Sequence, residues 1–88
     1  MADTQVMRIE HIVKTPGVLG GKARITGRRI GVWMIANLYY DQDTTVEEFK
    51  EHFDLSPSEV YAALAYYHDH KEEIDLQIDE ARSLESDL

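Results

Sequence analysis

The sequence predicts a small, mainly helical domain with short β-strands near its N-terminus. Three observations lead to this fold class. All five glycines lie between residues 17 and 31, which leaves no room for a long regular element there. Capping boxes that begin at Thr45 and Ser56 mark two helix starts. No proline or glycine interrupts the chain from Ser58 to Leu88. At 88 residues, the chain is long enough for one domain with a marginal core.

The N-terminal third has the pattern of short strands and turns. Residues 6–14 are rich in β-branched side chains and end at the turn signal Thr15-Pro16-Gly17, which predicts a strand. Short apolar pieces at 18–19, 23–25 and 29–30 alternate with the glycines. We therefore expect several short strands joined by tight turns.

Two helices and the start of a third follow. Residues 32–40 are apolar on nearly every side, which predicts a helix buried on most faces. Thr45 with Glu48 caps a helix over 46–53. Ser56, Pro57 and Glu59 begin the next helix after a short connection. The last two helices have the spacing of a helix-turn-helix.

The sequence predicts that this third helix continues to the C-terminus as one long element. Its distal part carries seven acidic residues and the apolar stripe Ile74, Ile78, Ala81 and Leu84. Such a seam is longer than one small core can cover, so we expect residues 71–88 to form an acidic amphipathic extension of a domain spanning residues 1–70. The stripe is the candidate partner-binding surface. A solvated, frayed tail is the alternative.

Charge is divided unevenly along the chain. Residues 1–33 carry six basic and two acidic residues, whereas residues 34–88 carry three basic and fifteen acidic residues. The start of the third helix has no lysine or arginine, so any contact with DNA falls to the basic segment. The candidate nucleic-acid-binding residues are Lys22, Arg24, Arg28 and Arg29. Pairing of these cations with acidic helices of a neighbouring subunit is the alternative.

Several function classes have little support in the sequence. The chain has no cysteine, no apolar segment long enough to span a membrane, and no export signal, so we expect a cytoplasmic protein. Lys22 is followed by alanine rather than Ser or Thr, so the glycines do not form a phosphate-binding loop. His68 and His70 would point to different sides of a helix. We expect no metal, no cofactor and no catalytic residue, and hence no enzyme.

The run Gly20 to Val32, GGKARITGRRIGV, resembles the signature of the domain-of-unknown-function 433 (DUF433) family, G-K-P-x-I-x-G-T-R-I-x-V. Residues 46–49 and 55–67 resemble later family segments, and the match runs in order over about residues 7–78. Ala23 stands in place of the usual proline and Arg28 in place of the usual threonine. The resemblance implies a homeodomain-like helical fold preceded by short strands, with dimers formed partly through the N-terminal segment.

The resemblance also implies an antitoxin, because members of the family often look like antitoxins paired with PIN-like ribonuclease toxins. We therefore expect a dimer that neutralises such a toxin through its acidic C-terminal helix, with operator DNA as a further partner. A homo-oligomeric structural module without toxin or DNA binding is the main alternative, and an uncharacterised small enzyme is a more remote one. We expect neither a membrane nor a small-molecule substrate as a partner.

Overall fold

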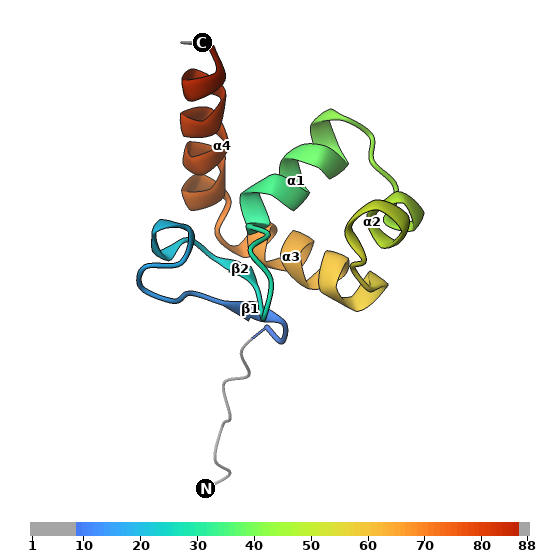
Figure 1. The fold of residues 1–88 in the computed structure, drawn as a ribbon. Helices are drawn as coiled ribbons and strands as arrows, with labels where there is room; N and C mark the ends of the chain where they lie inside the picture. The colour runs from blue at the N-terminus through green and yellow to red at the C-terminus, as the bar shows by residue number, and fades with distance from the viewer. Residues whose placement is uncertain (1–8, 87–88) are drawn as a thin grey trace, which may run out of the picture.

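The computed structural model describes residues 9–86, and these confirm the predicted mainly helical fold with short N-terminal strands. Strands β1 (Ile12–Val13) and β2 (Arg24–Ile25) pair antiparallel, with Ile12 opposite Ile25. Helix α3 crosses the middle of the molecule, with α1 and α2 over one side, the strands beneath one end, and α4 rising from that end (Figure 1).

The N-terminal strands are shorter than the sequence pattern predicts. Of the strand expected over residues 6–14, residues 6–8 lie outside the described part of the chain, and β1 covers Ile12–Val13 alone. His11 adopts a φ of 74°, a left-handed conformation that interrupts an extended chain. The expected strand at 18–19 is wrong, because Leu19–Gly21 form a short 3-10 helix, η1.

Helices α1 (Val32–Asp41) and α2 (Val46–Phe53) lie where the sequence predicts them. The Thr45 hydroxyl accepts a hydrogen bond from the backbone N–H of Glu48 at 3.1 Å, and the Glu48 carboxylate accepts one from the Thr45 N–H at 3.1 Å. The bond from the Thr45 N–H, and then a bond from the Thr45 hydroxyl to the same carboxylate at 3.1 Å, lower the pKa of Glu48. Asp54 then ends α2 in a left-handed conformation, and Leu55 is buried in the core.

The predicted single helix from residue 58 to the C-terminus is divided into two. Helix α3 (Pro57–Asp69) begins at the expected Ser56 cap, and α4 (Lys71–Ser86) follows after a break at His70. His70 has φ −133° and ψ 45°, outside the helical region. The change of direction lets α4 pack against α1, so burial of its apolar side chains outweighs the loss of a continuous helix.

One core serves all of these elements. It contains Ala23 and Ile25 from the glycine-rich segment, the inner faces of α1 to α3, and Ile74 and Ile78 from α4. The domain boundary predicted at residue 70 therefore coincides with a break in the helix, but α4 is packed into the same core as residues 12–67.

Candidate functional site

Two of the four predicted DNA-contacting cations bind the protein's own backbone. The Arg28 guanidinium donates to the carbonyl of Asp54 at 3.0 Å and to that of Phe53, at the C-terminal end of α2. That position suits a cation, because the last carbonyls of a helix carry partial negative charge. Arg24 donates to the Arg28 carbonyl at 3.0 Å and to the Thr15 hydroxyl at 3.1 Å. Both arginines hold the glycine-rich segment in place.

The other two predicted cations remain at the surface. Arg29 is exposed, and among residues 9–86 its side chain forms no hydrogen bond or ion pair. Lys22 is half-buried and lies apart from the two structural arginines, beside α4. The structure thus does not bring the four cations together as one free surface.

The predicted partner-binding stripe is also divided. Ile74 is completely buried and Ile78 is 8% exposed, because both pack into the protein's own core. The expectation that these two side chains lack a place in the monomer is wrong. Burial of each contributes roughly 1.5–3 kcal/mol to folding. Ala81 is half-buried and Leu84 is 70% exposed, so the distal half of the stripe alone is available to a partner.

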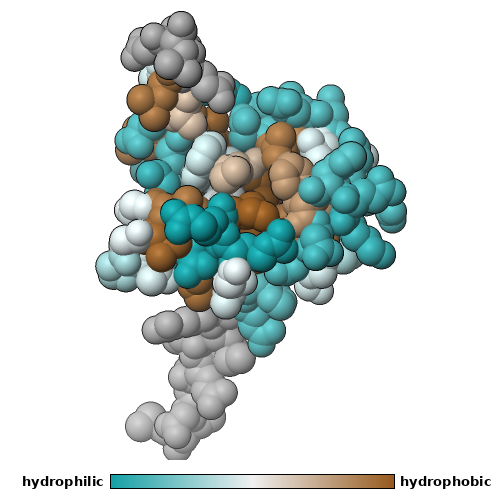
Figure 2. All heavy atoms as spheres, in the orientation of Figure 1, coloured by the Kyte–Doolittle hydropathy of each residue, from teal (hydrophilic) through white to brown (hydrophobic). Residues whose placement is uncertain are grey.

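A different face of α4 is exposed along its length. Glu72, Leu76, Asp79 and Ser83 are all exposed and follow the four-three-four spacing of one helical face. Leu76 is 60% exposed. Hydrophobic and hydrophilic residues mix at the upper left of the molecule, where α4 lies (Figure 2). The sequence reading missed Leu76, although its offset from the Ile74–Ile78 seam is the signal that places it on the opposite side of the helix.

A groove runs between α4 and the start of α1. It has a volume of about 310 Å³ and is lined by Lys22, Trp33, Gln77, Glu80, Ala81 and Leu84. The groove brings together one predicted nucleic-acid-binding residue, Lys22, and two predicted partner-binding residues, Ala81 and Leu84. Trp33, Gln77 and Glu80 were not predicted as site residues: Trp33 has the pattern of a core or interface anchor, and Glu80 that of a solvated acidic face.

Two of the residues that line the groove, Trp33 and Gln77, have unusual surroundings. A Cβ at Gly31 would lie 2.7 Å from Nε1 of Trp33, so the glycine allows the indole to fold back over the start of α1. Oε1 of Gln77 is inaccessible to water and accepts no hydrogen bond from the described residues. A buried polar atom without a partner costs about 1–3 kcal/mol.

Tyrosines attach α4 to the other helices. The Tyr67 hydroxyl donates to the Asp75 carboxylate at 2.8 Å. Burial, and then this hydrogen bond, raise the pKa of Tyr67 to about 12. Arg82 donates to the Asn37 side chain at 3.0 Å and pairs with Asp41, both on α1. Tyr67 thus joins α3 to α4, and Arg82 joins α4 to α1.

A second polar cluster lies at the break between α3 and α4. Lys14 forms an ion pair with Glu73, which also accepts a hydrogen bond from the Tyr66 hydroxyl at 3.0 Å. Burial by itself raises the pKa of Glu73, but the bonds from Lys14 and Tyr66 outweigh it and the net pKa is lowered. The His70 ring stacks on Tyr66 with ring centroids 4.2 Å apart. The cluster ties the strand end to the helix break.

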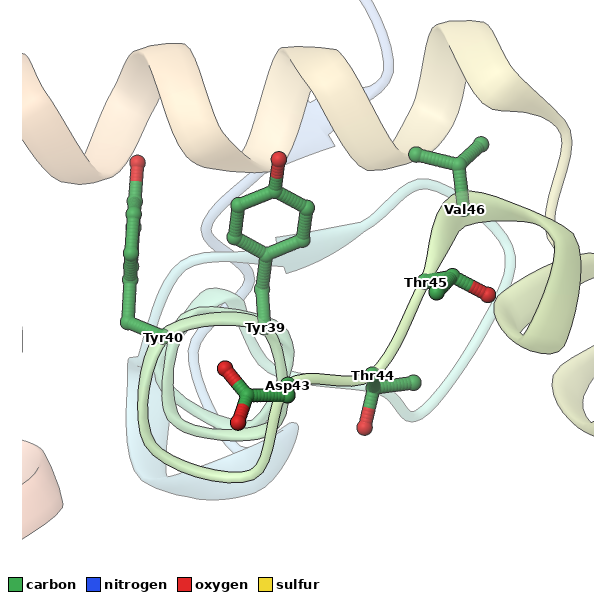
Figure 3. Close-up of a pocket in the computed structure, with 6 residues that line it drawn as sticks. All are labelled: Tyr39, Tyr40, Asp43, Thr44, Thr45 and Val46. Carbon is green, nitrogen blue, oxygen red and sulfur yellow. The ribbon is translucent and has the colours of Figure 1, made fainter.

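A further open pocket, of about 410 Å³, lies at the α1–α2 connection. Figure 3 shows the hydroxyl groups of Tyr39 and Tyr40 pointing toward α3, and the Asp43 carboxylate and the Thr44 hydroxyl turned away from it. The Tyr40 hydroxyl is bonded to Nε2 of His68 at 2.6 Å, and the Thr45 hydroxyl caps α2. Two of the polar groups that line the pocket, the hydroxyls of Tyr40 and Thr45, therefore already serve internal contacts.

Residues 9–86 contain neither a cluster of metal-ligating side chains nor a helix that could span a membrane. Between residues 9 and 86, no three His, Cys, Asp or Glu side chains group so that they could hold one metal ion. His68 contacts Tyr40 whereas His70 contacts Tyr66, so the two histidines serve different sites. No helix in this range is both long and apolar enough to cross a bilayer.

Sequence and structure comparisons both relate this chain to one family of known proteins. A crystal structure at 2.00 Å resolution of a DUF433 member protein from Anabaena variabilis ATCC 29413 is 37% identical to this chain, with a TM-score of 0.70. The similarity covers 78% of this chain and 68% of that one. A search of curated proteins found no match. The sequence model of the DUF433 family, described as a protein of unknown function, matches residues 12–67, so α4 lies beyond it. The chain belongs to the DUF433 family.

Proposed function

We propose that this protein is the antitoxin of a type II toxin–antitoxin system and neutralises a PIN-like ribonuclease in the cytoplasm. The observation that carries the proposal is the outward face of α4, defined here as Glu72, Leu76, Asp79 and Ser83, which combines carboxylates with an exposed leucine. An apolar anchor within negative charge is the chemistry that a basic, RNA-binding cleft would accept.

This assignment moves the contact away from the stripe predicted in the sequence. Ile74 and Ile78 are occupied by the protein's own core, so Leu76 takes their place as the apolar anchor. Glu72 and Asp79 flank it on the same face and are exposed. Ribonuclease clefts bind phosphates through cations, so carboxylates placed there would compete with RNA.

The test is to purify a PIN-like ribonuclease, if a gene adjacent to this protein's encodes one, and to measure its inhibition as cleavage of a labelled RNA. We expect the wild-type protein to inhibit it, and Glu72→Lys/Asp79→Lys to weaken inhibition at least about 10-fold through charge repulsion. Leu76→Asp should have a similar effect.

A matched control reverses two exposed acids on another helix. Glu47→Lys/Glu51→Lys makes the same change in net charge on α2. Equal loss of inhibition in both double variants would show that overall charge, rather than the outward face of α4, is responsible. Absence of inhibition by the wild-type protein would refute the proposal.

Operator DNA is a second partner that an antitoxin implies. Of the four candidate cations, Lys22 and Arg29 are the two whose side chains form no hydrogen bond or ion pair with the described residues. Lys22 lines the groove beside α4, so Arg29 is the candidate for operator DNA. Arg29→Ala should reduce the slope of log affinity against log salt by about 1 on the operator fragment. An unchanged slope would remove Arg29 from the DNA contact.

A further inference from the structure

We propose that a second copy of this chain docks on the groove of Lys22, Trp33, Gln77, Glu80, Ala81 and Leu84 about a two-fold axis. In this arrangement Lys22 faces the partner subunit's Glu80, and the same contact recurs on the other side of the axis. The proposal specifies the surface of the dimer that the antitoxin function assumes.

The apolar part of the groove is suited to an interface. Leu84 is 70% exposed, and Trp33 is half-buried across from it. Tryptophan and leucine that meet at one small hollow can interlock with the same pair on a second molecule. Gly31 keeps the indole folded over the start of α1, so the tryptophan is already oriented for the contact.

The charges of the groove favour a second copy over another partner. Lys22 comes from the glycine-rich segment and Glu80 from α4, so opposite charges stand on opposite sides of the hollow. Within the described residues, neither of the two side chains forms an ion pair. A surface with one positive and one negative side is complementary to itself after a two-fold rotation.

Gln77 adds a polar group that is unsatisfied in the single chain. Its Oε1 has no hydrogen-bond donor among the described residues, although the side chain lines the groove. A small rotation would turn the amide toward the opening, where a second molecule supplies donors. In the single chain, the groove therefore contains a partly exposed aromatic surface, two charges without an ion-pair partner and an amide oxygen without a hydrogen-bond donor.

The groove and the outward face of α4 share no residue, and Glu80 of the groove lies one helical turn from Leu76. Asp79 lines a different hollow, on the opposite side of α4 from Gln77 and Leu84. A dimer through the groove therefore leaves Glu72, Leu76 and Asp79 available to a toxin. The dimer and the proposed inhibition can be tested independently.

The experiment is sedimentation equilibrium of the full chain from about 5 to 300 μM, a range chosen because a small interface gives weak dimers. We expect a reversible dimer for the wild-type protein. Leu84→Asp should raise the dissociation constant at least about 10-fold, whereas Leu76→Asp, at the other exposed leucine of α4, should leave it within about 3-fold.

Charge reversal provides the decisive comparison. Lys22→Glu and Glu80→Lys should each weaken the dimer about 10-fold, and the double variant should recover to within about 3-fold of wild type, because the pair is restored across the axis. Emission of Trp33, the single tryptophan, should shift with concentration in wild type and not in Leu84→Asp. Circular dichroism verifies that each variant is folded.

Three results would overturn this proposal. The first is a wild-type protein that remains monomeric throughout the concentration range. The second is a dimer whose dissociation constant does not change in Leu84→Asp. The third is a double charge variant whose dissociation constant is as high as those of the single variants. A monomer that still inhibits the ribonuclease would reject the dimer and leave the antitoxin function standing. A dimer that forms through the groove but does not inhibit the ribonuclease would support the interface and reject the antitoxin function.

Discussion

The guanidinium of Arg28 lies 3.0 Å from the carbonyl oxygen of Asp54, so the glycine-rich segment is joined to the end of α2 across 26 positions of sequence. This contact assigns Arg28 a structural role that its charge alone does not suggest. Arg28 stands where the family signature has threonine, and the larger side chain is what reaches the helix end.

Arg28→Ala should therefore destabilise the protein by about 1–3 kcal/mol, because two carbonyl groups lose a charged donor. The neighbouring exposed Arg29→Ala should change the free energy of unfolding by less than about 0.5 kcal/mol. Urea denaturation followed by circular dichroism measures both. An equal change in the free energy of unfolding for the two variants would mean that the contact of Arg28 with the end of α2 does not stabilise the fold.

Gly31→Ala should displace Trp33. The φ of Gly31 is −77°, which suits any residue, so the loss of stability arises only from the contact of the new Cβ with the indole. We expect a loss of about 1–3 kcal/mol and a shift in tryptophan emission. Gly27→Ala is the matched control, because Gly27 has φ +78° and open space around it. That variant should lose about 1–2 kcal/mol through backbone strain and leave the emission unchanged.

Ile78→Ala should destabilise the whole domain by about 2–5 kcal/mol, because it leaves a cavity between α4 and the core. Leu84→Ala, on the same helix but 70% exposed, should change stability by less than about 0.5 kcal/mol. Unfolding curves from circular dichroism and from Trp33 emission should coincide for wild type. If Ile78→Ala has no more effect than Leu84→Ala, α4 is not part of the core in solution.

Alkaline pH should destabilise the protein through Tyr67. Burial, and then the bond to Asp75, raise the pKa of Tyr67 to about 12 in the folded state, against about 10 in an unfolded chain. A raised pKa means that the stabilisation is complete below pH 10 and is lost as the pH rises toward 12.

Tyr67→Phe is the control for this pH effect. The variant should be less stable at pH 7 because the bond to Asp75 is gone, and its further loss between pH 10 and 12 should be smaller than that of wild type. Denaturation midpoints at several pH values measure the difference. A wild-type and a variant curve that run parallel above pH 10 would exclude Tyr67 as the group responsible.

The positions of α1 and α2 and the start of α3 could be predicted because their signals are local. The Thr45–Glu48 and Ser56–Glu59 capping boxes are formed as expected, since each requires atoms only three residues apart. The nearly all-round apolar pattern of residues 32–40 likewise gave α1. The short strands were harder to place, because a single left-handed residue such as His11 shortens a strand without changing its composition.

The site could be predicted only in part. Lys22, Ala81 and Leu84 do lie together, but the sequence assigned them to two different partners. Arg24 and Arg28 resembled free cations because their acceptors are mostly backbone carbonyls, which leave no mark in a sequence. Trp33 and Gln77 joined the groove through the folding of α4 against α1, a contact between distant residues.

The sequence by itself determined the fold class, the starts of α1, α2 and α3, and the family, because these depend on residue types at short spacings. Tertiary structure alone decided that Ile74 and Ile78 of α4 are covered by the protein's own core rather than by a partner. The helical period is compatible with several directions of the chain after His70, and burial of Ile74 and Ile78 in the core selected one of them. That choice turned Leu76 outward and set Leu84 opposite Trp33.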